Sequence, residues 1–324
     1  MTLTQRVFIA TASLAVLLAG QVQAQSYPTK PVRFIIPFAP GGTTDIVGRI
    51  VADRIGRQLG QSLVVENRGG GGGSIGAEMA ARAAPDGYTI GMATVSTMGT
   101  NPAATPKLAY DPLRDFVPIT NLVGVPNVLA VHPSVPAQNM AEFLKLLKAN
   151  PGKYAYASSG TGGIAHMLGE LFKLTTGTSL VHIPYRGSGP AINDVIAGQV
   201  PVLFDNLPSS LGHIESGRMR ALAVSSPKRL HALPDVPTFA ELGMKEVNDP
   251  AWYGLVAPAG TPADIIEKIH AASVRTLAQP DVIERLRQQG AEPIGNTPEE
   301  FGQQIRAELA KWQRVVKEQN IHLD

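Results

Sequence analysis

Residues 32–45 read VRFIIPFAPGGTTD, and this stretch decides the fold. Its first five residues are apolar except for Arg33 and predict a buried strand, which the Pro-Gly-Gly at residues 40–42 interrupts. Apolar residues then recur at helical spacing over residues 46–59. The order of strand, glycine-marked turn and helix is typical of an α/β protein.

The same order continues and divides the chain into two groups of elements. In the first group, strands are predicted at residues 62–65 and 88–93, with a helix at 77–84 between them. The second group begins near Pro126 and contains, in chain order, a strand at 128–131, a helix at 140–149, a strand at 154–157, a helix at 164–176 and strands at 180–183, 202–205 and 219–224. This alternation predicts an α/β fold with a largely parallel sheet.

The C-terminal part returns to a strand near residues 252–256, and two predicted helices follow it. Each helix has a start signal, a threonine followed by proline and acidic residues, at Thr261 and at Thr297. The last helix carries an apolar face that must be buried, and we expect it to pack on the first group; this face consists of Phe301, Ile305, Leu309, Trp312 and Val316. We therefore predict two lobes, residues 25–125 with 254–324, and residues 126–253.

The N-terminus predicts export. Residues 1–24 contain one basic residue, Arg6, no acidic residue, an apolar run at 7–18 and small side chains at Val22 and Ala24. This order is typical of a secretory signal peptide cleaved after about Ala24, so we expect the mature chain in the periplasm. The alternative is an uncleaved anchor, which the short apolar run disfavours because a membrane span needs about 20 residues.

The composition excludes several functions. The chain contains 28 Lys and Arg, 26 Asp and Glu, and no Cys. This near-balance of charge creates no field for nucleic acid, and the absence of cysteine excludes disulfides and thiolate metal sites. The seven histidines stand apart, without H-x-x-x-H or H-x-H spacing. We therefore expect no metal and no cofactor.

The loop at residues 67–76, NRGGGGGSIG, formally matches two motifs. From Gly71 to Gly76 it fits the dinucleotide fingerprint G-x-G-x-x-G, but no acidic residue stands at 87–106, where the ribose partner belongs. Ser74 lies in the G-x-S-x-G pattern of a serine hydrolase, although a loose glycine stretch separates it from the strand. Two other interpretations stay open: a flexible turn, or a binding loop that offers backbone N–H groups at a helix N-terminus.

Four loops at predicted helix starts are rich in glycine or hydroxyl residues, at 37–45, 67–76, 158–163 and 186–190. Backbone N–H groups and the helix dipole at such positions bind a carboxylate without a cation. In α/β sheets such loops cluster at the carboxyl ends of strands, where ligands bind. We therefore predict a cleft between the lobes that captures a small carboxylate without catalysis. The alternative is an exported serine hydrolase that uses Ser74.

Three charged side chains allow two interpretations each. Arg186 either makes a bidentate contact with a ligand carboxylate or is a solvated surface residue. Asp205 ends a predicted strand and is either a cleft residue or a cap of the next helix. Asp45, near a helix N-terminus, is either structural or a partner for an ordered water or a ligand ammonium.

Six motifs follow one another along nearly the whole mature chain: VRFIIPFAPGGTTD at 32–45, VVENR with its glycine run at 64–73, APDGYT at 84–89, YDPLRDF at 110–116, IPYRGSGP at 183–190 and LPDVPT at 233–238. Together they resemble the Bug-type receptors of the tripartite tricarboxylate transporter family. The resemblance implies a type II periplasmic-binding-protein fold, in which two lobes close on a ligand cleft between them.

In that family the loops after the first two strands hold one carboxylate, largely through backbone donors and water, and the second lobe meets the distal part of the ligand. On this chain the expected binding residues are Phe38, Ala39, Gly41, Gly42, Thr43, Asp45, Gly70, Gly72, Gly73, Ser74, Thr94, Ser96, Ser158, Thr161, Arg186 and Asp205. We expect a mono- or dicarboxylate, amino acid or aromatic acid as ligand, and the absence of a lysine or arginine cluster from the proposed loops favours a mono- or dicarboxylate over citrate. The resemblance also implies membrane subunits of a tripartite transporter as partners, and we expect a monomer.

Two positions depart from the family pattern. The family loop usually reads RPGAGG, and here Gly69 and Gly71 replace the Pro and Ala. Additional glycine raises the conformational entropy of the open loop, so we expect it to be more mobile before closure. Met98 stands near a position where the family often has a Thr-His pair, which weakens any inference of a polar group there.

Overall fold

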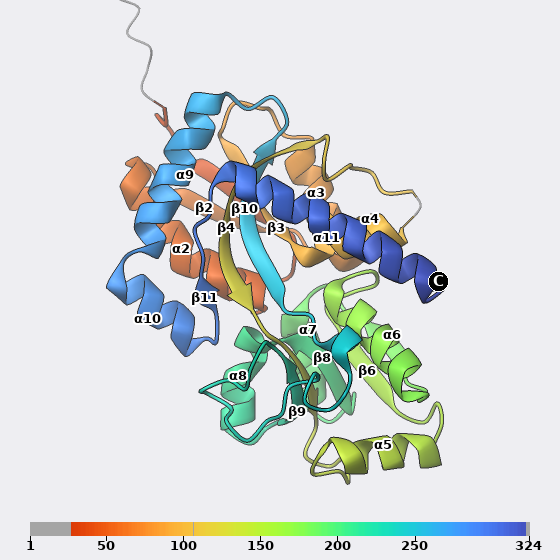
Figure 1. Cartoon of the computed structure of the whole chain (residues 1–324). Coiled ribbons are helices and arrows are strands. Elements are labelled where there is room, and N and C mark those ends of the chain that lie inside the picture. Colours follow the sequence, from red (N-terminus) through yellow and green to blue (C-terminus); the bar gives the residue numbers. More distant parts are fainter. Residues whose placement is uncertain (1–26, 106, 322–324) are drawn as a thin grey trace, which may run out of the picture.

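The computed structural model describes residues 27–105 and 107–321. The predicted signal peptide and its cleavage site lie outside these described residues. Figure 1 shows two lobes, one above the other, with strands that run between them. Among the described residues, no helix combines the length and the apolar character that crossing a membrane requires.

The first lobe is built on a six-stranded sheet in the order β11-β4-β10-β3-β1-β2. Its strands are β1 (Val32–Ile36), β2 (Leu63–Asn67), β3 (Thr89–Thr94), β4 (Phe116–Val125), β10 (Ala251–Pro258) and β11 (Glu292–Pro293). Its helices are α2 (Thr43–Leu59), α3 (Ser74–Ala81), α4 (Asn101–Ala104), α9 (Ala263–Leu277), α10 (Pro280–Gln288) and α11 (Pro298–Glu318), with a 3-10 turn, η1 (Gly71–Gly73), and a π-helical turn, η2 (Ser96–Thr100).

The second lobe is built on a five-stranded sheet in the order β7-β6-β8-β5-β9. Its strands are β5 (Asn127–Val131), β6 (Ala155–Ser158), β7 (Val181–Pro184), β8 (Val202–Asn206) and β9 (Arg220–Ser225). Its helices are α5 (Met140–Ala149), α6 (Ile164–Thr176), α7 (Ser188–Ile196) and α8 (Leu207–Glu215), and a 3-10 turn, η3 (Lys245–Val247), precedes the return to the first lobe.

Both sheets are mixed. In the first, β1 is parallel to β2 and β3, whereas β10 is antiparallel to β3 and β4. In the second, β6 is parallel to β7 and β8, whereas β5 is antiparallel to β8 and β9. The prediction of a largely parallel sheet is therefore correct for only part of each sheet, because the strands that pass between the lobes insert in the antiparallel direction.

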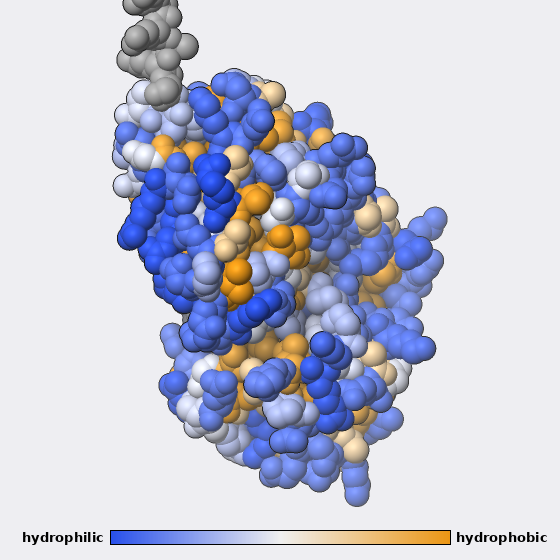
Figure 2. Space-filling model, turned by 60° about the vertical axis from the view of Figure 1, so that its left-hand side comes forward, coloured by the Kyte–Doolittle hydropathy of each residue, from blue (hydrophilic) through white to orange (hydrophobic). Residues whose placement is uncertain are grey.

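The crossing strands connect the lobes. β4 and β5 are separated by Pro126, and β10 brings the chain back, pairing Ala251 with Val125 at the junction. The sequence did not predict β4, because Pro, Thr and Asn residues interrupt its apolar pattern. Figure 2 shows hydrophobic side chains gathered at this junction, where a groove is lined by residues that include Leu230, Trp252 and Ile294. The predicted division of the chain into residues 25–125 with 254–324 and residues 126–253 stays a prediction.

Of the two start signals predicted for the C-terminal helices, only the one at Thr297 caps its helix. Thr297 caps α11 as predicted, since its hydroxyl accepts the Glu300 N–H over 3.2 Å while the Glu300 carboxylate accepts the Thr297 N–H over 2.9 Å. α11 then packs on the first lobe through a buried face that includes Trp312, as expected. Thr261 does not cap α9, because its hydroxyl donates to the Pro258 carbonyl over 2.8 Å. A further helix between them, α10, was not predicted.

Candidate ligand-binding cleft

The loops that were predicted to bind an anion lie at the carboxyl ends of strands. The loop after β1 enters α2 at Thr43 and the loop after β2 leads through η1 into α3 at Ser74, so both helices begin before the residues that their apolar spacing indicated. In the second lobe, the loops after β6 and β7 enter α6 and α7. Each lobe therefore contributes two helix N-termini, whose backbone N–H groups favour an anion.

The two lobes touch one another through these loops. The Ala39 N–H donates to the Arg186 carbonyl over 3.1 Å. Gly72 has a φ of 59°, and a Cβ at this position would lie only 2.4 Å from the Thr161 carbonyl oxygen. A Cβ on Gly160 would lie 2.8 Å from the nitrogen of Gly72. The observed contact between the lobes therefore requires glycine at both positions.

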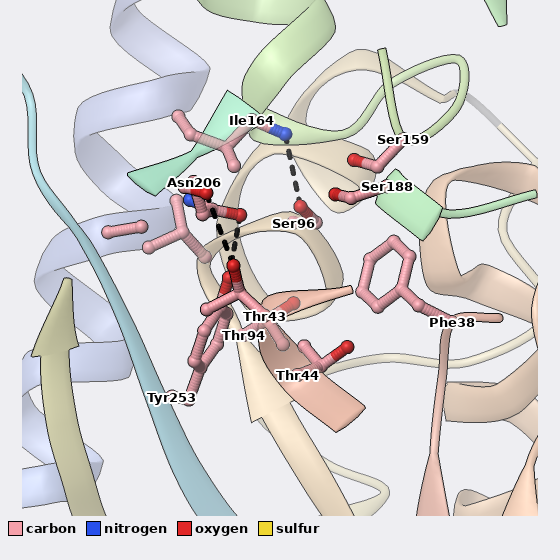
Figure 3. A pocket seen from close by; sticks show the side chains of 12 residues that line it. Phe38, Thr43, Thr44, Thr94, Ser96, Ser159, Ile164, Ser188, Asn206 and Tyr253 are labelled. Atoms are coloured by element: carbon pink, nitrogen blue, oxygen red, sulfur yellow. Dashed lines mark hydrogen bonds between the residues drawn. The ribbon is translucent and has the colours of Figure 1, made fainter. Parts of the chain in front are cut away.

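A pocket with about 320 Å³ of space not filled by protein atoms lies between the lobes (Figure 3). This figure includes space open to solvent, and the cavity itself measures only about 10 Å³, roughly the room for one water molecule, so the lobes lie almost closed on one another. The wall consists of Phe38, Thr43, Thr44, Thr94, Val95, Ser96, Ser159, Ile164, Ser188, Asn206, Ala251 and Tyr253. None of these twelve side chains carries a charge at neutral pH. An anion in this pocket is therefore held by hydroxyl, amide and backbone groups.

The sequence prediction found part of this wall. Phe38, Thr43, Thr94 and Ser96 were predicted to bind the ligand and line the pocket. Eight wall residues were not predicted individually: Thr44, Val95, Ser159, Ile164, Ser188, Asn206, Ala251 and Tyr253. Ser159 and Ser188 belong to loops that had been singled out, so their hydroxyl groups were an available signal. Ala251 and Tyr253 had no signal, because β10 reaches the pocket from a distant part of the chain.

Asp45 supports the loop after β1. Its carboxylate accepts the Gly41 N–H over 3.1 Å and the Arg49 Nε–H over 2.9 Å. Arg49 also donates to the Asn67 side chain, which donates to the Phe38 carbonyl over 3.0 Å. Burial would raise the pKa of Asp45, but the hydrogen bonds from Arg49 and Gly41 outweigh it and lower this pKa. Ala39 and Gly42, two residues of this loop that were also predicted to bind the ligand, lie beside the pocket wall and are not part of it.

The glycine loop lies next to the pocket. Gly70, Gly72 and Gly73 all have positive φ values, of 137°, 59° and 99°. Asn101 Nδ2 donates to the Gly72 carbonyl over 2.8 Å and so holds the loop in place. Ser74 is half-buried, and among the described residues no histidine hydrogen-bonds with its hydroxyl. In the part of the chain that the structure describes, Ser74 therefore has no histidine partner of the kind that activates a serine nucleophile.

Asp205 lies behind the second-lobe wall. Its buried carboxylate accepts hydrogen bonds from three hydroxyl groups, those of Ser188 over 2.5 Å, Ser209 over 2.6 Å and Ser210 over 2.7 Å. Burial raises the pKa of Asp205, and the serine hydrogen bonds oppose this only in part. Ser188 is itself a wall residue, so Asp205 acts on the pocket through Ser188.

Side-chain hydrogen bonds cross from lobe to lobe at the pocket (Figure 3). Thr43 Oγ1 accepts the Ser209 N–H over 3.1 Å and lies 2.8 Å from Ser209 Oγ. It also donates to the Asn206 carbonyl over 3.2 Å. The Tyr253 hydroxyl, on the crossing strand β10, donates to Asn206 Oδ1 over 2.6 Å. The first lobe and the crossing strand thus both fasten to the start of α8.

The other predicted residues of the second lobe take supporting positions. Ser158 is buried at the end of β6, and its hydroxyl lies 2.6 Å from His182 Nε2 on the neighbouring strand β7. Thr161 presents its carbonyl to the glycine loop of the first lobe. The Arg186 side chain is exposed and makes no ion pair or hydrogen bond to another described residue. Only the backbone of Arg186 takes part in the closed cleft.

A histidine pair lies behind the loop before α6. The rings of His166 and His182 stack with centroids 3.7 Å apart, and His166 Nδ1 accepts the Gly162 N–H over 3.1 Å. Burial, and then the neighbouring His166, lower the pKa of His182 to about 3. Glu170 lies 3.5 Å from His166, and hydrogen bonds from His166 and Lys173 outweigh burial and lower its pKa to about 2. His182 is therefore neutral near pH 7, and His166 supports the loop through its contact with Gly162.

The chain has two lobes joined by crossing strands. Between the lobes lies an uncharged pocket of hydroxyl groups and helix N-termini, and this arrangement is that of a solute-binding protein. Within residues 27–105 and 107–321, no group of three or more His, Cys, Asp or Glu is placed to hold a metal ion. Residues 47–321 match the model of the tripartite tricarboxylate transporter family receptor, and the chain belongs to this family. The resemblance inferred from the sequence motifs is thereby confirmed.

Individual relatives agree with this assignment. The chain is 39% identical to protein BugT of Bordetella pertussis over 313 residues, which cover 96% of this chain and 95% of BugT. A structure described as a periplasmic transporter is 54% identical, with a TM-score of 0.91 and coverage of 92% of this chain and 100% of that one. The R. palustris protein Rpa4515, solved with adipate, is 36% identical, with a TM-score of 0.88 and coverage of 91% and 99%. The chain is a solute-binding receptor of this periplasmic family.

Proposed function

We propose that this receptor captures a small mono- or dicarboxylate in the periplasm and delivers it to the membrane subunits of a tripartite transporter. The pocket wall carries the proposal, because it combines hydroxyl groups and helix N-termini and contains no charged side chain. Such donors hold a carboxylate without a cation. The adipate in the R. palustris relative is a carboxylate of this kind and supports the same class of ligand here.

Capture proceeds by closure of the lobes. The ligand carboxylate contacts loops of both lobes, so it binds the closed state more tightly than the open state and shifts the population toward it. The direct contacts of Ala39 with Arg186 and of Thr43 with Ser209 then form. The closed receptor, a monomer released from its signal peptide after about Ala24, presents its surface to the membrane subunits.

A thermal-unfolding screen of the purified mature chain tests the ligand class. The screen contains mono- and dicarboxylates, amino acids, aromatic acids and the matching primary alcohols. A ligand present at a hundred times its dissociation constant adds about 2.7 kcal/mol to the unfolding free energy. We expect at least one carboxylate to raise the melting temperature and its alcohol to leave it unchanged. If no carboxylate stabilises the chain, the proposed ligand class is wrong.

We also propose that the chain is a receptor and not an enzyme. The competing hydrolase requires Ser74 as nucleophile, and this residue has no histidine partner among the described residues. We expect purified protein to show no turnover of short ester substrates, and we expect Ser74→Ala to leave that result unchanged. Ester turnover that disappears in Ser74→Ala would contradict the proposal.

A further inference from the structure

The hydroxyl group of Ser188 has a single proton, and the protein uses this proton internally. Ser188 Oγ lies 2.5 Å from Asp205 Oδ1. Two further serine hydroxyls meet the other carboxylate oxygen, an arrangement that suits an ionised acid, which accepts hydrogen bonds and does not donate. Ser188 is only 5% exposed and lines the pocket, so it offers the ligand the lone pairs of its oxygen alone.

Other hydroxyl groups in the wall keep their protons for a ligand. Thr44 and Ser159 are buried, and neither side chain makes a hydrogen bond to another described residue. Ser96 Oγ accepts the Ile164 N–H over 3.0 Å, which leaves its own proton free. In Figure 3, Ser159, Ser96 and Ser188 lie close together on one side of the pocket and Thr44 lies on another. The wall thus contains several donors and, at Ser188, an acceptor that cannot donate.

The negative charge of Asp205 favours the same kind of ligand group beside Ser188 as the hydrogen bonds do, namely a hydrogen-bond donor. Asp205 is 2% exposed, and the wall of the pocket contains no cation that would offset it. Its field reaches the wall, because burial and then the charge of Asp205 hold the pKa of the Tyr253 hydroxyl well above its usual range. A second negative charge near Ser188 would meet this field in a poorly solvated site.

We infer that the pocket selects a carboxylate whose second polar group is a hydrogen-bond donor, such as a hydroxyl, amide or ammonium group, over an alkanedioate with two ionised carboxylates. The inference rests on the proposed function, because the first carboxylate binds to the donor groups of the pocket. The donor of the ligand then pairs with Ser188 Oγ. A second carboxylate would instead place its own lone pairs against those of Ser188 Oγ, and it would bring a second negative charge toward Asp205.

Titration calorimetry with matched acids tests this selection on the mature chain near neutral pH. One set contains 4-hydroxybutyrate, succinate and butyrate, and a longer set contains 6-hydroxyhexanoate, adipate and hexanoate. An unmatched buried acceptor corresponds to a loss of about tenfold in affinity or more. We therefore expect the hydroxy acid in at least one set to bind about tenfold more tightly than the dicarboxylate of the same length.

Two variants assign the selection to these residues. Ser188→Ala removes the acceptor, so the affinity ratio of hydroxy acid to dicarboxylate should fall toward one. Asp205→Asn replaces the acceptor-only carboxylate by an amide that can donate to Ser188, which frees the serine proton and should improve dicarboxylate binding relative to the hydroxy acid. Ser216→Ala is the matched control, because Ser216 lies in the same lobe, donates its hydroxyl to the Gly212 carbonyl over 2.7 Å, and neither contacts Asp205 nor lines the pocket. It should retain the wild-type ratio.

The outcomes separate this inference from the proposed function. If succinate or adipate binds the wild-type chain as tightly as the hydroxy acids, the selection is overturned while carboxylate capture stands. If the wild-type ratio persists in Ser188→Ala, Ser188 is not the selecting residue and the inference is overturned. If no carboxylate binds at all, the proposed function fails as well. The affinity ratio of hydroxy acid to dicarboxylate, measured on the wild-type chain, tests the inference even where a variant does not fold.

Discussion

Each lobe places one buried aspartate behind the pocket, and the two aspartates differ in their partners. Asp45 of the first lobe contacts Arg49 and a backbone N–H, and its pKa is lowered. Asp205 of the second lobe has three serine hydroxyls and no cation among its hydrogen-bond partners, and its pKa is raised. Asp45 therefore holds a backbone loop in shape, whereas Asp205 orients hydroxyl groups.

This difference shows how the two walls divide the recognition of one ligand. The first lobe supplies loops whose shape depends on glycine and on the ion pair of Asp45 with Arg49. The second lobe supplies hydroxyl groups whose direction depends on Asp205. Backbone donors recognise any carboxylate, while oriented hydroxyls discriminate between ligands according to where each has a proton.

The largest expected effect comes from the backbone contact between the walls. Gly72→Ala places a Cβ against the Thr161 carbonyl, so the closed state should become strained and ligand affinity should fall by about a hundredfold, as overpacking by 2–3 kcal/mol implies. Gly177→Ala is the matched control. Gly177 has nearly the same φ, 61° against 59°, but apart from its chain neighbours no described residue has an atom within 4 Å of its Cβ position. Calorimetry on both variants checks this, and equal affinities would contradict it.

A smaller effect is expected from the hydroxyl bridge between the walls. Thr43→Val keeps the shape of the side chain but removes its hydrogen bonds with Ser209 and Asn206, so affinity should fall by about tenfold. Thr89→Val, in the same lobe, is the control because Thr89 makes no side-chain hydrogen bond to another described residue. Dissociation rates measured by stopped flow should rise in Thr43→Val alone. An unchanged rate would show that the bridge does not hold the lobes closed.

Acid should weaken the second wall through its histidine pair. The folded pKa of His182, about 3, lies below the usual value of 6.5, so the unfolded chain binds the proton more readily. The stability that neutral His182 contributes is therefore present above pH 6.5 and is lost as the pH falls toward 3. Between pH 7 and 5 we expect a loss of about 1 kcal/mol in unfolding free energy, allowing for partial solvation.

Urea unfolding of wild type and His182→Gln across this pH range measures the effect. The variant should be less sensitive to acid, and the exposed His231→Gln should behave as wild type. Glu170, with a pKa of about 2 against the usual 4.5, adds a separate loss that begins below pH 4.5. Identical pH profiles for wild type and His182→Gln would refute the role given to the pair.

The smallest effect is expected at Arg186. Its side chain is exposed and only its carbonyl takes part in closure, so Arg186→Ala should change carboxylate affinity by less than about twofold, as for a solvated surface charge. Calorimetry at low salt measures this directly. A loss of tenfold or more would restore the bidentate contact that the sequence had offered as one interpretation.

The sequence predicted the loops better than the side chains within them. Thr43 and Ser96 were assigned to the binding site and line the pocket. Ser158 and Asp205 were assigned to it as well, but they lie behind the wall and act on their neighbours. A hydroxyl or carboxyl group in a loop reveals that polar chemistry is present there. It does not reveal whether the side chain faces the cavity, because that depends on the turn of each loop and on its packing.

Periodicity and motif order by themselves determined the α/β character, the two groups of elements, the glycine-rich helix entrances and the family. These properties follow from local patterns, in which apolar spacing and turn residues act over a few positions. Only the tertiary structure decided that β10 brings Tyr253 to the pocket, that Asp205 commits the proton of Ser188, and that Gly72 and Thr161 meet across the lobes. Each of these joins residues distant in sequence or depends on side-chain direction, and both are consequences of three-dimensional packing.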